Sequence, residues 1–252
     1  MKASRTDGAS VSDVAVILPT YCEADNIGNL IHTIMNLGID PKVLVIDDSS
    51  PDGTGEIVKK MQEVCPNIVL LSRPFKAGLG TAITCGFRFL LSEQVPPKYI
   101  ITMDADHSHN PEDLPRLLQA AKNGYDVVVG SRYCDGGRVE GWGIGRLAMS
   151  KVANKITAAI VSLPINDFTS GFRCYSKEYV ERVLPNLHCH TYEIQIETLR
   201  QAHIHNAHVT EIPIAFANRK KGKSKLTANE ILSFFLYALK AALRNRSTPE
   251  FK

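Results

Sequence analysis

The stretch YIITMDADHSHNPEDLPRLLQAAKNGYDVVV, residues 99–129, decides the fold of this chain. It opens with an apolar run at residues 99–103 and closes with a second one at residues 127–129. Between them, Asn110 stands before Pro111 and two acidic residues, a pattern typical of the first turn of a helix, which we expect to run to residue 122. Two near-continuous apolar strands joined by a helix predict a parallel β-α-β unit that is covered on both faces.

The same alternation of strands and helices continues on both sides of this unit. Further strands are predicted at Val14–Leu18, Val43–Ile46, Ile68–Leu71 and Val209–Ala217, and further helices at Asn26–Leu37, Thr54–Val64, Leu79–Leu91, Ile144–Ser162 and Ala228–Leu243. No linker-like stretch divides these segments. We therefore expect one α/β domain over residues 1–252, with a mostly parallel central sheet, helices on both faces and a flexible N-terminus of about residues 1–12.

Composition excludes several classes of protein. With 44% hydrophobic and 22% charged residues, the 252-residue chain lies in the ordinary globular range, and a net charge of +3 is too small to indicate nucleic-acid binding. The six cysteines never fall at C-x-x-C spacing, which predicts reduced and mostly buried thiols. The longest apolar stretch, Ile231–Leu243, is shorter than the roughly 20 residues of a transmembrane helix, so we expect no membrane span.

Acidic residues follow three of the predicted strands. Asp104-Ala105-Asp106 comes after the strand at 99–103, Asp47-Asp48 after the strand at 43–46, and Glu23 shortly after the first strand. In open α/β sheets, ligands bind beyond the carboxyl ends of the strands. Asp104 and Asp106 predict a site for Mg²⁺ or Mn²⁺, because these cations take carboxylate oxygens and complete their shells with substrate phosphates; the alternative is a solvated turn.

Two further strand-end segments allow more than one interpretation. Asp47-Asp48 forms either a polar turn or a pair of acceptors for a base edge or a ribose hydroxyl. Gly78-Leu79-Gly80 is no dinucleotide-binding fingerprint, because Ile83 stands at the third glycine position. We expect this glycine loop to let the backbone approach a ligand.

Polar and basic residues in the second half of the chain favour an anionic ligand. Arg146, Ser150 and Asn154 recur every four residues and share one helix face, which forms either a phosphate-binding face or a solvated polar stripe. The segment at 167–173 forms either a packed loop or a wall of the site. The basic segment at 219–225 is either an exposed loop or a source of cations for a diphosphate leaving group.

Seven motifs stand in order along the chain: Pro19-Thr20-Tyr21-x-Glu23, Asp47-Asp48-x-Ser50-Pro51-Asp52-Gly53-Thr54, Gly78-Leu79-Gly80-Thr81-Ala82, Met103-Asp104-Ala105-Asp106, Gly130-Ser131-Arg132-Tyr133, Asp167-Phe168-Thr169-Ser170-Gly171-Phe172-Arg173 and Ser224-Lys225-Leu226. This ordered set resembles the dolichyl-phosphate mannosyltransferases within the family 2 glycosyltransferases. The resemblance implies a GT-A fold and transfer of mannose from GDP-mannose to dolichyl phosphate with inversion. The product would be dolichyl β-D-mannosyl phosphate, the lipid-linked donor for N-glycosylation, O-mannosylation and GPI-anchor synthesis.

The resemblance also implies roles for particular residues. GDP-mannose would be held by Pro19, Tyr21, Glu23, Val45, Asp47, Asp104, Ala105, Asp106, Arg132, Arg219 and Lys225. The divalent cation would be held by Asp104, Ala105, Asp106 and Ser108, where Ser108 replaces a glutamine of microbial members and its part in the set stays open. The acceptor phosphate would meet Arg146 and Ser150, and catalysis would depend on Asp104, Asp106, Arg219 and Lys225.

The residue types in the motifs are consistent with a transfer to a phosphate acceptor. A phosphate monoester is already mostly anionic at neutral pH, since its second pKa is about 6, and needs no strong general base. The motifs alone leave two alternatives open: a UDP-glucose-dependent dolichyl-phosphate glucosyltransferase, and a non-catalytic nucleotide-sugar-binding subunit.

The predicted last helix, residues 228–243, is apolar around most of its circumference, and it either packs on the sheet or lies against lipid or a partner. Lys220, Lys221 and Lys223 add attraction to anionic headgroups. The resemblance implies small transmembrane partner subunits that tether the chain to the cytosolic face of the endoplasmic reticulum membrane. By itself the chain is then expected to be soluble.

Overall fold

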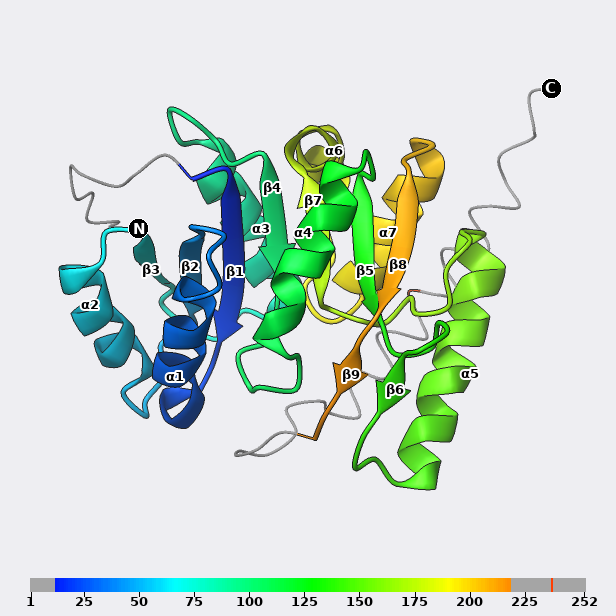
Figure 1. The fold of residues 1–252 in the computed structure, drawn as a ribbon, viewed down its shortest axis with the longest axis horizontal. Coiled ribbons are helices and arrows are strands. Elements are labelled where there is room, and N and C mark those ends of the chain that lie inside the picture. Colours follow the sequence, from blue (N-terminus) through cyan, green and yellow to red (C-terminus); the bar gives the residue numbers. More distant parts are fainter. Residues whose placement is uncertain (1–11, 219–236, 238–252) are drawn as a thin grey trace.

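The computed structural model describes residues 12–218 and Tyr237. Seven strands form one sheet in the order β3-β2-β1-β4-β7-β5-β8, and a small second sheet pairs β6 with β9 (Figure 1). The strands are β1 Val14–Thr20, β2 Lys42–Asp47, β3 Ile68–Ser72, β4 Tyr99–Thr102, β5 Val127–Ser131, β6 Arg138–Val139, β7 Arg173–Ser176, β8 Val209–Pro213 and β9 Ala215–Phe216. The helices are α1 Ala24–Met35, α2 Thr54–Val64, α3 Leu79–Leu91, α4 Leu114–Lys122, α5 Ile144–Val161, α6 Lys177–Val183 and α7 Ile194–Ile204, with short 3-10 helices η1 Pro111–Asp113 and η2 Leu184–Asn186.

Two apolar clusters on opposite faces of the sheet hold the helices in place. Strand side chains alternate between the faces, so Ala15 and Ile17 of β1 belong to one cluster while Val14 and Val16 belong to the other. The first cluster packs α3, α5, α6 and α7 on the sheet, and the second packs α1, α2 and α4. The predicted α/β fold with helices on both faces is confirmed (Figure 1).

Most predicted elements agree with the structure to within two residues at each end, but the second half of the sheet differs from the expectation. β4 and β5 do not pair with each other, because β7 lies between them and is antiparallel to both. β7 reads Arg-Cys-Tyr-Ser, which is too short and too polar at its ends to be recognised as a buried strand. The expected single strand at 209–217 is also wrong, since β8 and β9 join different sheets.

Other expectations concern the cysteines, the two ends of the chain and a membrane span. All six cysteines are free, but only Cys174 is buried, so the prediction of mostly buried thiols is wrong. Ser12 is buried and its hydroxyl donates to the carbonyls of Val14 and Asp40. Residues 1–11 and the predicted helix at 228–243, apart from Tyr237, lie outside the described residues. Within the described part, no helix is both long and apolar enough to cross a membrane.

Candidate active site

The carboxyl ends of the parallel strands bring the motifs to one edge of the sheet. β1 and β2 pair in register, so Thr20 lies opposite Asp47. β4 runs parallel to β1 on its other side and leads directly into Met103 and the Asp104–Asp106 segment. The small sheet of β6 and β9 lies beyond the ends of β5 and β8 (Figure 1).

Asp47 and Asp48 are both buried and both bonded to protein groups. Asp47 accepts hydrogen bonds from the hydroxyls of Thr20 (3.0 Å) and Ser50 (2.5 Å) and from the Ser50 amide (3.0 Å). Asp48 forms a two-pronged ion pair with Arg73, at 2.6 and 2.7 Å. Protein groups thus hold both carboxylates in place at the end of β2, and Arg73 is a partner that the sequence motifs did not identify.

The other residues predicted to hold the nucleotide lie beside these two. Tyr21 is half-buried, with the Lys76 ammonium 4.8 Å from the centre of its ring. Glu23 is buried and accepts a hydrogen bond from the Asn26 side chain at 2.8 Å. Pro19 is half-buried at the end of β1, and Val45 differs from the rest because its side chain is completely buried in the core. Val45 thus presents no side-chain surface to a ligand.

The glycine loop before α3 approaches the chain itself. A Cβ on Gly78 would lie 2.4 Å from the His190 carbonyl oxygen, and a Cβ on Gly80 would lie 2.3 Å from the Cys189 carbonyl oxygen. The Gly80 amide donates to the His190 carbonyl at 2.9 Å. The expectation that these glycines admit a ligand is wrong, because residues 189–190 fill the space that the missing side chains leave.

Asp104 and Asp106 occupy different environments. The Asp104 side chain is 38% exposed, whereas Asp106 is 4% exposed. One oxygen of Asp106 accepts hydrogen bonds from the amide (3.0 Å) and hydroxyl (2.5 Å) of Ser108. Ala105 between them is buried in the core, so only its backbone is available to a ligand.

His109 supports Asp104 from within the protein. Its ring is buried, stacks on Phe172 with 5.0 Å between centroids, and meets the edge of Phe216 at 5.2 Å. Burial lowers the pKa of His109, although the nearby carboxylates of Asp104 and Asp106 oppose this. The neutral ring accepts the Asp104 amide hydrogen at Nδ1, 3.3 Å away, which assigns the ring proton to Nε2. His109 was not among the predicted site residues.

The donor set fits a hard divalent cation that is shared with a substrate. Among residues 12–218 and Tyr237, there is no group of three or more His, Cys, Asp or Glu side chains that could enclose a metal. Asp104 and Asp106 together offer carboxylate oxygens, while the Ser108 hydroxyl is directed at Asp106. Mg²⁺ and Mn²⁺ are commonly held by one or two carboxylates plus phosphate oxygens and water, so two carboxylates suffice for such a site.

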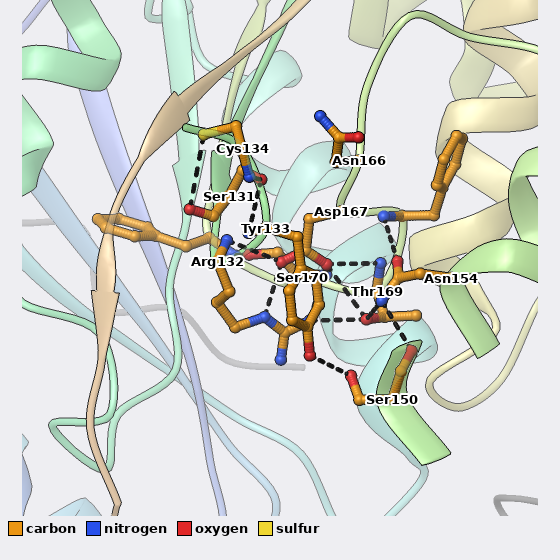
Figure 2. Close-up of polar contacts among 12 residues, drawn as sticks. Ser131, Arg132, Tyr133, Cys134, Ser150, Asn154, Asn166, Asp167, Thr169 and Ser170 are labelled. Atoms are coloured by element: carbon orange, nitrogen blue, oxygen red, sulfur yellow. Dashed lines mark hydrogen bonds and ion pairs between the residues drawn. The ribbon is translucent and has the colours of Figure 1, made fainter. Parts of the chain in front are cut away.

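Arg132 and Asp167 form a buried ion pair at the end of β5 (Figure 2). The guanidinium donates to both carboxylate oxygens at 2.7 Å, and the Arg132 amide donates to one of them at 3.0 Å. Burial by itself raises the pKa of Asp167, but Arg132 more than offsets this and holds that pKa below its ordinary value. The Nη2 atom of Arg132, which donates to Asp167 Oδ1, also donates to the Thr169 hydroxyl at 2.6 Å.

Aromatic side chains surround Arg132 and connect it to Arg146. The Arg132 guanidinium lies 5.2 to 5.6 Å from the ring centres of Tyr133, Phe216 and Trp142. The Arg146 guanidinium lies 4.0 Å from the same Trp142 ring. Two arginines therefore share one indole, an arrangement that gathers positive charge at one place.

The polar stripe on α5 divides into two parts. Ser150 accepts a hydrogen bond from the Tyr133 hydroxyl at 2.7 Å, which joins α5 to the end of β5 (Figure 2). Asn154 is buried; it accepts from the Phe168 amide at 2.6 Å and donates to the Thr169 hydroxyl at 3.2 Å. Asn154 is thus a structural tie to the 167–170 loop, while Arg146 at the start of the helix remains exposed.

Arg219 and Lys225 lie outside the described residues, so their predicted roles stay predictions. The last described residues before them, Ala217 and Asn218, contact the segment after Asp106 and the segment before Trp142. The Ala217 amide donates to the Ser108 carbonyl at 3.1 Å, and the Asn218 side chain donates to the Gly141 carbonyl.

Comparison with known proteins agrees with this geometry. A family model described as glycosyl transferase family 2 matches residues 15–184. The chain belongs to this family. As a family 2 glycosyltransferase it is an enzyme.

Similar family 2 members include two bacterial proteins with named activities. The chain is 36% identical to polyprenol monophosphomannose synthase of Mycolicibacterium smegmatis, over 92% of this chain and 87% of the relative. It is 34% identical to undecaprenyl-phosphate mannosyltransferase of Micrococcus luteus, over 85% of this chain and 87% of the relative.

Solved structures share the fold at lower identity. Glucosyl-3-phosphoglycerate synthase of Mycobacterium tuberculosis, in complex with Mn²⁺, UDP and glucosyl-3-phosphoglycerate, matches with a TM-score of 0.64 at 17% identity, covering 94% of this chain and 81% of that one. A complex of that enzyme with Mn²⁺, UDP-glucose and phosphoglyceric acid matches with a TM-score of 0.65 at 18% identity, with the same coverage.

Replacing Asp167 by Asn is expected to destabilise this family 2 glycosyltransferase by about 3–5 kcal/mol at pH 7, because it leaves Arg132 buried without its counter-charge. Folding lowers the pKa of Asp167. The contribution of Asp167 to the free energy of unfolding is therefore fully present above the pKa of the unfolded chain, about 3.9, and is lost as the pH falls through the pKa of the folded protein. Urea unfolding between pH 3 and pH 7 measures both effects. The free energy of unfolding of the variant is expected to depend less on pH than that of wild type.

Asp135→Asn serves as the matched control, because Asp135 is exposed and lies three residues after Arg132. Its free energy of unfolding is expected to stay within about 0.5 kcal/mol of wild type. Equal stability of wild type and Asp167→Asn at pH 7 would contradict the role given to the ion pair.

Proposed function

We propose that the enzyme transfers mannose from GDP-mannose to dolichyl phosphate, with inversion at the anomeric carbon. The observation that carries the proposal is the position of Asp104 and Asp106 at the end of β4, with Arg132 and Arg146 grouped around Trp142 beyond Phe216. Phe216 contacts both His109, which supports Asp104, and Arg132, so one ring separates the two halves. A donor held by the carboxylates would then lie beside an acceptor phosphate held by Arg146 and Ser150.

The donor half would bind the nucleotide sugar through Asp104 and Asp106. A divalent cation bound there, Mg²⁺ or Mn²⁺, would neutralise charge on the diphosphate as it departs. Asp47, Tyr21 and Glu23 line the ends of β1 and β2, where the guanosine is expected. We propose that Arg219 and Lys225 complete the charge stabilisation of the leaving group.

The acceptor half would bind the phosphate of the lipid. Arg146 supplies guanidinium donors, which match phosphate oxygens, and Ser150 supplies a hydroxyl tied to Tyr133. Arg132, whose guanidinium is paired with Asp167, stays assigned to the donor. The phosphate oxygen attacks the anomeric carbon, the bond from that carbon to the diphosphate breaks, and the diphosphate leaves with the electron pair. Because the acceptor is already anionic, the residues have to orient and hold charge and need not remove a proton.

A lipid acceptor is supported by the outer side of α5. Ile144 is 88% exposed, Val152 is 52% exposed and Met149 is 48% exposed, on the same helix that carries Arg146 and Ser150. Apolar side chains that stay in water are costly, and a polyprenyl chain beside the phosphate site would cover them. The names of both bacterial relatives, a polyprenol monophosphomannose synthase and an undecaprenyl-phosphate mannosyltransferase, agree with this class of acceptor.

The decisive experiment offers the purified chain labelled GDP-mannose or UDP-glucose together with dolichyl phosphate, and measures the labelled lipid extracted into organic solvent. Mannose transfer that needs Mg²⁺ or Mn²⁺ and stops with chelator is the expected result. Transfer from UDP-glucose alone would replace the donor in this proposal, and tight nucleotide-sugar binding without any transfer would indicate a non-catalytic subunit.

Replacing Arg146 by Ala is expected to raise the KM for dolichyl phosphate about tenfold or more, since a charge-assisted hydrogen bond contributes about 1.5–3 kcal/mol. The KM for GDP-mannose should change little, because Arg146 lies on the acceptor side of Trp142. Steady-state kinetics with each substrate varied in turn measure this split. Lys155→Ala, an exposed cation on the same helix, is the control and is expected to behave like wild type; an effect confined to GDP-mannose would place the acceptor phosphate elsewhere.

We further propose that the enzyme works at the cytosolic face of the endoplasmic reticulum membrane, tethered by small transmembrane partner subunits. The chain expressed alone is expected in the soluble fraction, and co-expression with such subunits is expected to move it to the membrane pellet. Carbonate extraction of the pellet tests the tether: resistance of the chain expressed alone would contradict it.

A further inference from the structure

Gln195, the second residue of α7, lies beside the donor half of the site. The residue is 5% exposed, and its hydrogen bonds in the described part involve its backbone. The fully buried polar atoms without a partner in this part lie on Trp142, Arg173 and Arg200, so the Gln195 amide reaches solvent. A Cβ built on Gly171 would lie 3.1 Å from the Gln195 amide nitrogen and 3.7 Å from an Asp104 carboxylate oxygen. The amide and the carboxylate therefore both lie next to Gly171, where a side chain would press on the amide.

The position of Gln195 is fixed by buried contacts. Arg173 is completely buried and donates to the Gln195 carbonyl at 2.7 Å, and to the Phe168 carbonyl at 2.9 Å. The Gly171 carbonyl in turn accepts a hydrogen bond from the Thr102 hydroxyl of β4 at 2.8 Å. Gln195 is thus held by its backbone through Arg173 of β7, and β7 pairs with β4, the strand that leads to Asp104.

An amide that bonds only to water can exchange that water for a ligand group, and a ligand that reproduces the lost hydrogen bonds gains affinity. An amide offers both donors and an acceptor, which suits a hydroxyl group because a hydroxyl also donates and accepts. The proposed donor places its diphosphate at Asp104 and Asp106, and the hydroxyl-bearing group next to a diphosphate in a nucleotide sugar is the hexose.

We propose that Gln195 is a specificity-determining residue that hydrogen-bonds a hydroxyl of the hexose carried by the nucleotide-sugar donor. This rests on the proposed function, because it requires a nucleotide sugar at Asp104. It assigns α7, a helix that follows the last sequence motif of the described part, a direct role in reading the sugar.

The test compares binding of GDP-mannose with binding of GDP, each with Mn²⁺, by calorimetry on the full chain. Gln195→Met keeps the length of the side chain but removes the amide. This variant is expected to bind GDP-mannose about tenfold more weakly than wild type and to bind GDP within about twofold of wild type, because GDP lacks the hexose. Gln201→Met is the matched control: Gln201 is similarly buried on the same helix, nearly two turns further on, and this variant should bind both ligands like wild type.

Equal weakening of GDP and GDP-mannose by Gln195→Met, or no weakening of either, would overturn the assignment. Thermal unfolding of each variant shows that the fold is kept, and Gln195→Glu, which retains a hydrogen-bonding group, repeats the comparison if the methionine variant is unstable. Failure of the proposed donor would appear already in the wild type, and the same comparison is then made with UDP-glucose and UDP. A wild type that binds neither sugar nucleotide refutes both the proposed function and this inference.

Discussion

The buried ion pair between Arg132 and Asp167 is the constraint on which the arrangement of the site depends. Charges removed from water must be compensated, and here the carboxylate receives three hydrogen bonds from Arg132 alone. The pairing of Arg132 with Asp167 fixes the end of β5 against the loop that precedes β7. The same loop is held by Asn154 of α5, so the helix that carries Arg146 and Ser150 is placed by contacts that begin at the ion pair.

β7 has a comparable effect on the donor half. By entering the sheet antiparallel between β4 and β5, it brings the 167–173 segment alongside the strand that leads to Asp104. Thr102 and Arg173 then bind this segment to β4 and to α7, respectively. A parallel β4–β5 neighbour pair would leave no place for Gly171 next to Asp104. The interruption of the parallel sheet is therefore what joins the two halves of the site.

Between the halves lies a group of rings without net charge. His109 contacts both Phe172 and Phe216, and Phe216 contacts Trp142. The neutral imidazole lies on the Asp104 side, and the indole lies between two arginines. Apolar rings exclude water, and the charges on both sides interact more strongly as a result. Such a separation suits the proposed reaction, in which the acceptor phosphate must approach a carbon that is attached to a second anion, the diphosphate.

Hydrophobic periodicity and strand-end polarity are local signals, and they predicted β1 to β5, α1 to α5 and the position of Asp104 and Asp106. Resemblance of seven ordered motifs indicated the family as well. The sequence did not predict β6, β7, α6 or α7. The strand order follows from the fold, since β7 has too few apolar residues to show its burial, and hydrogen bonds to β4 and β5 place it.

The same distinction holds for single residues. Asp104 is recognisable from its neighbours in the chain, but the ion-pair partner of Arg132 and the ring partners of His109 lie on other segments. The same is true of Gln195, which comes close to Gly171 only in the folded chain. Gly78 and Gly80 look like ligand-binding glycines in the sequence and prove to accommodate residues 189–190, more than a hundred positions away. Long-range packing decides which polar groups are satisfied within the protein and which remain for a ligand, and no local pattern records that choice.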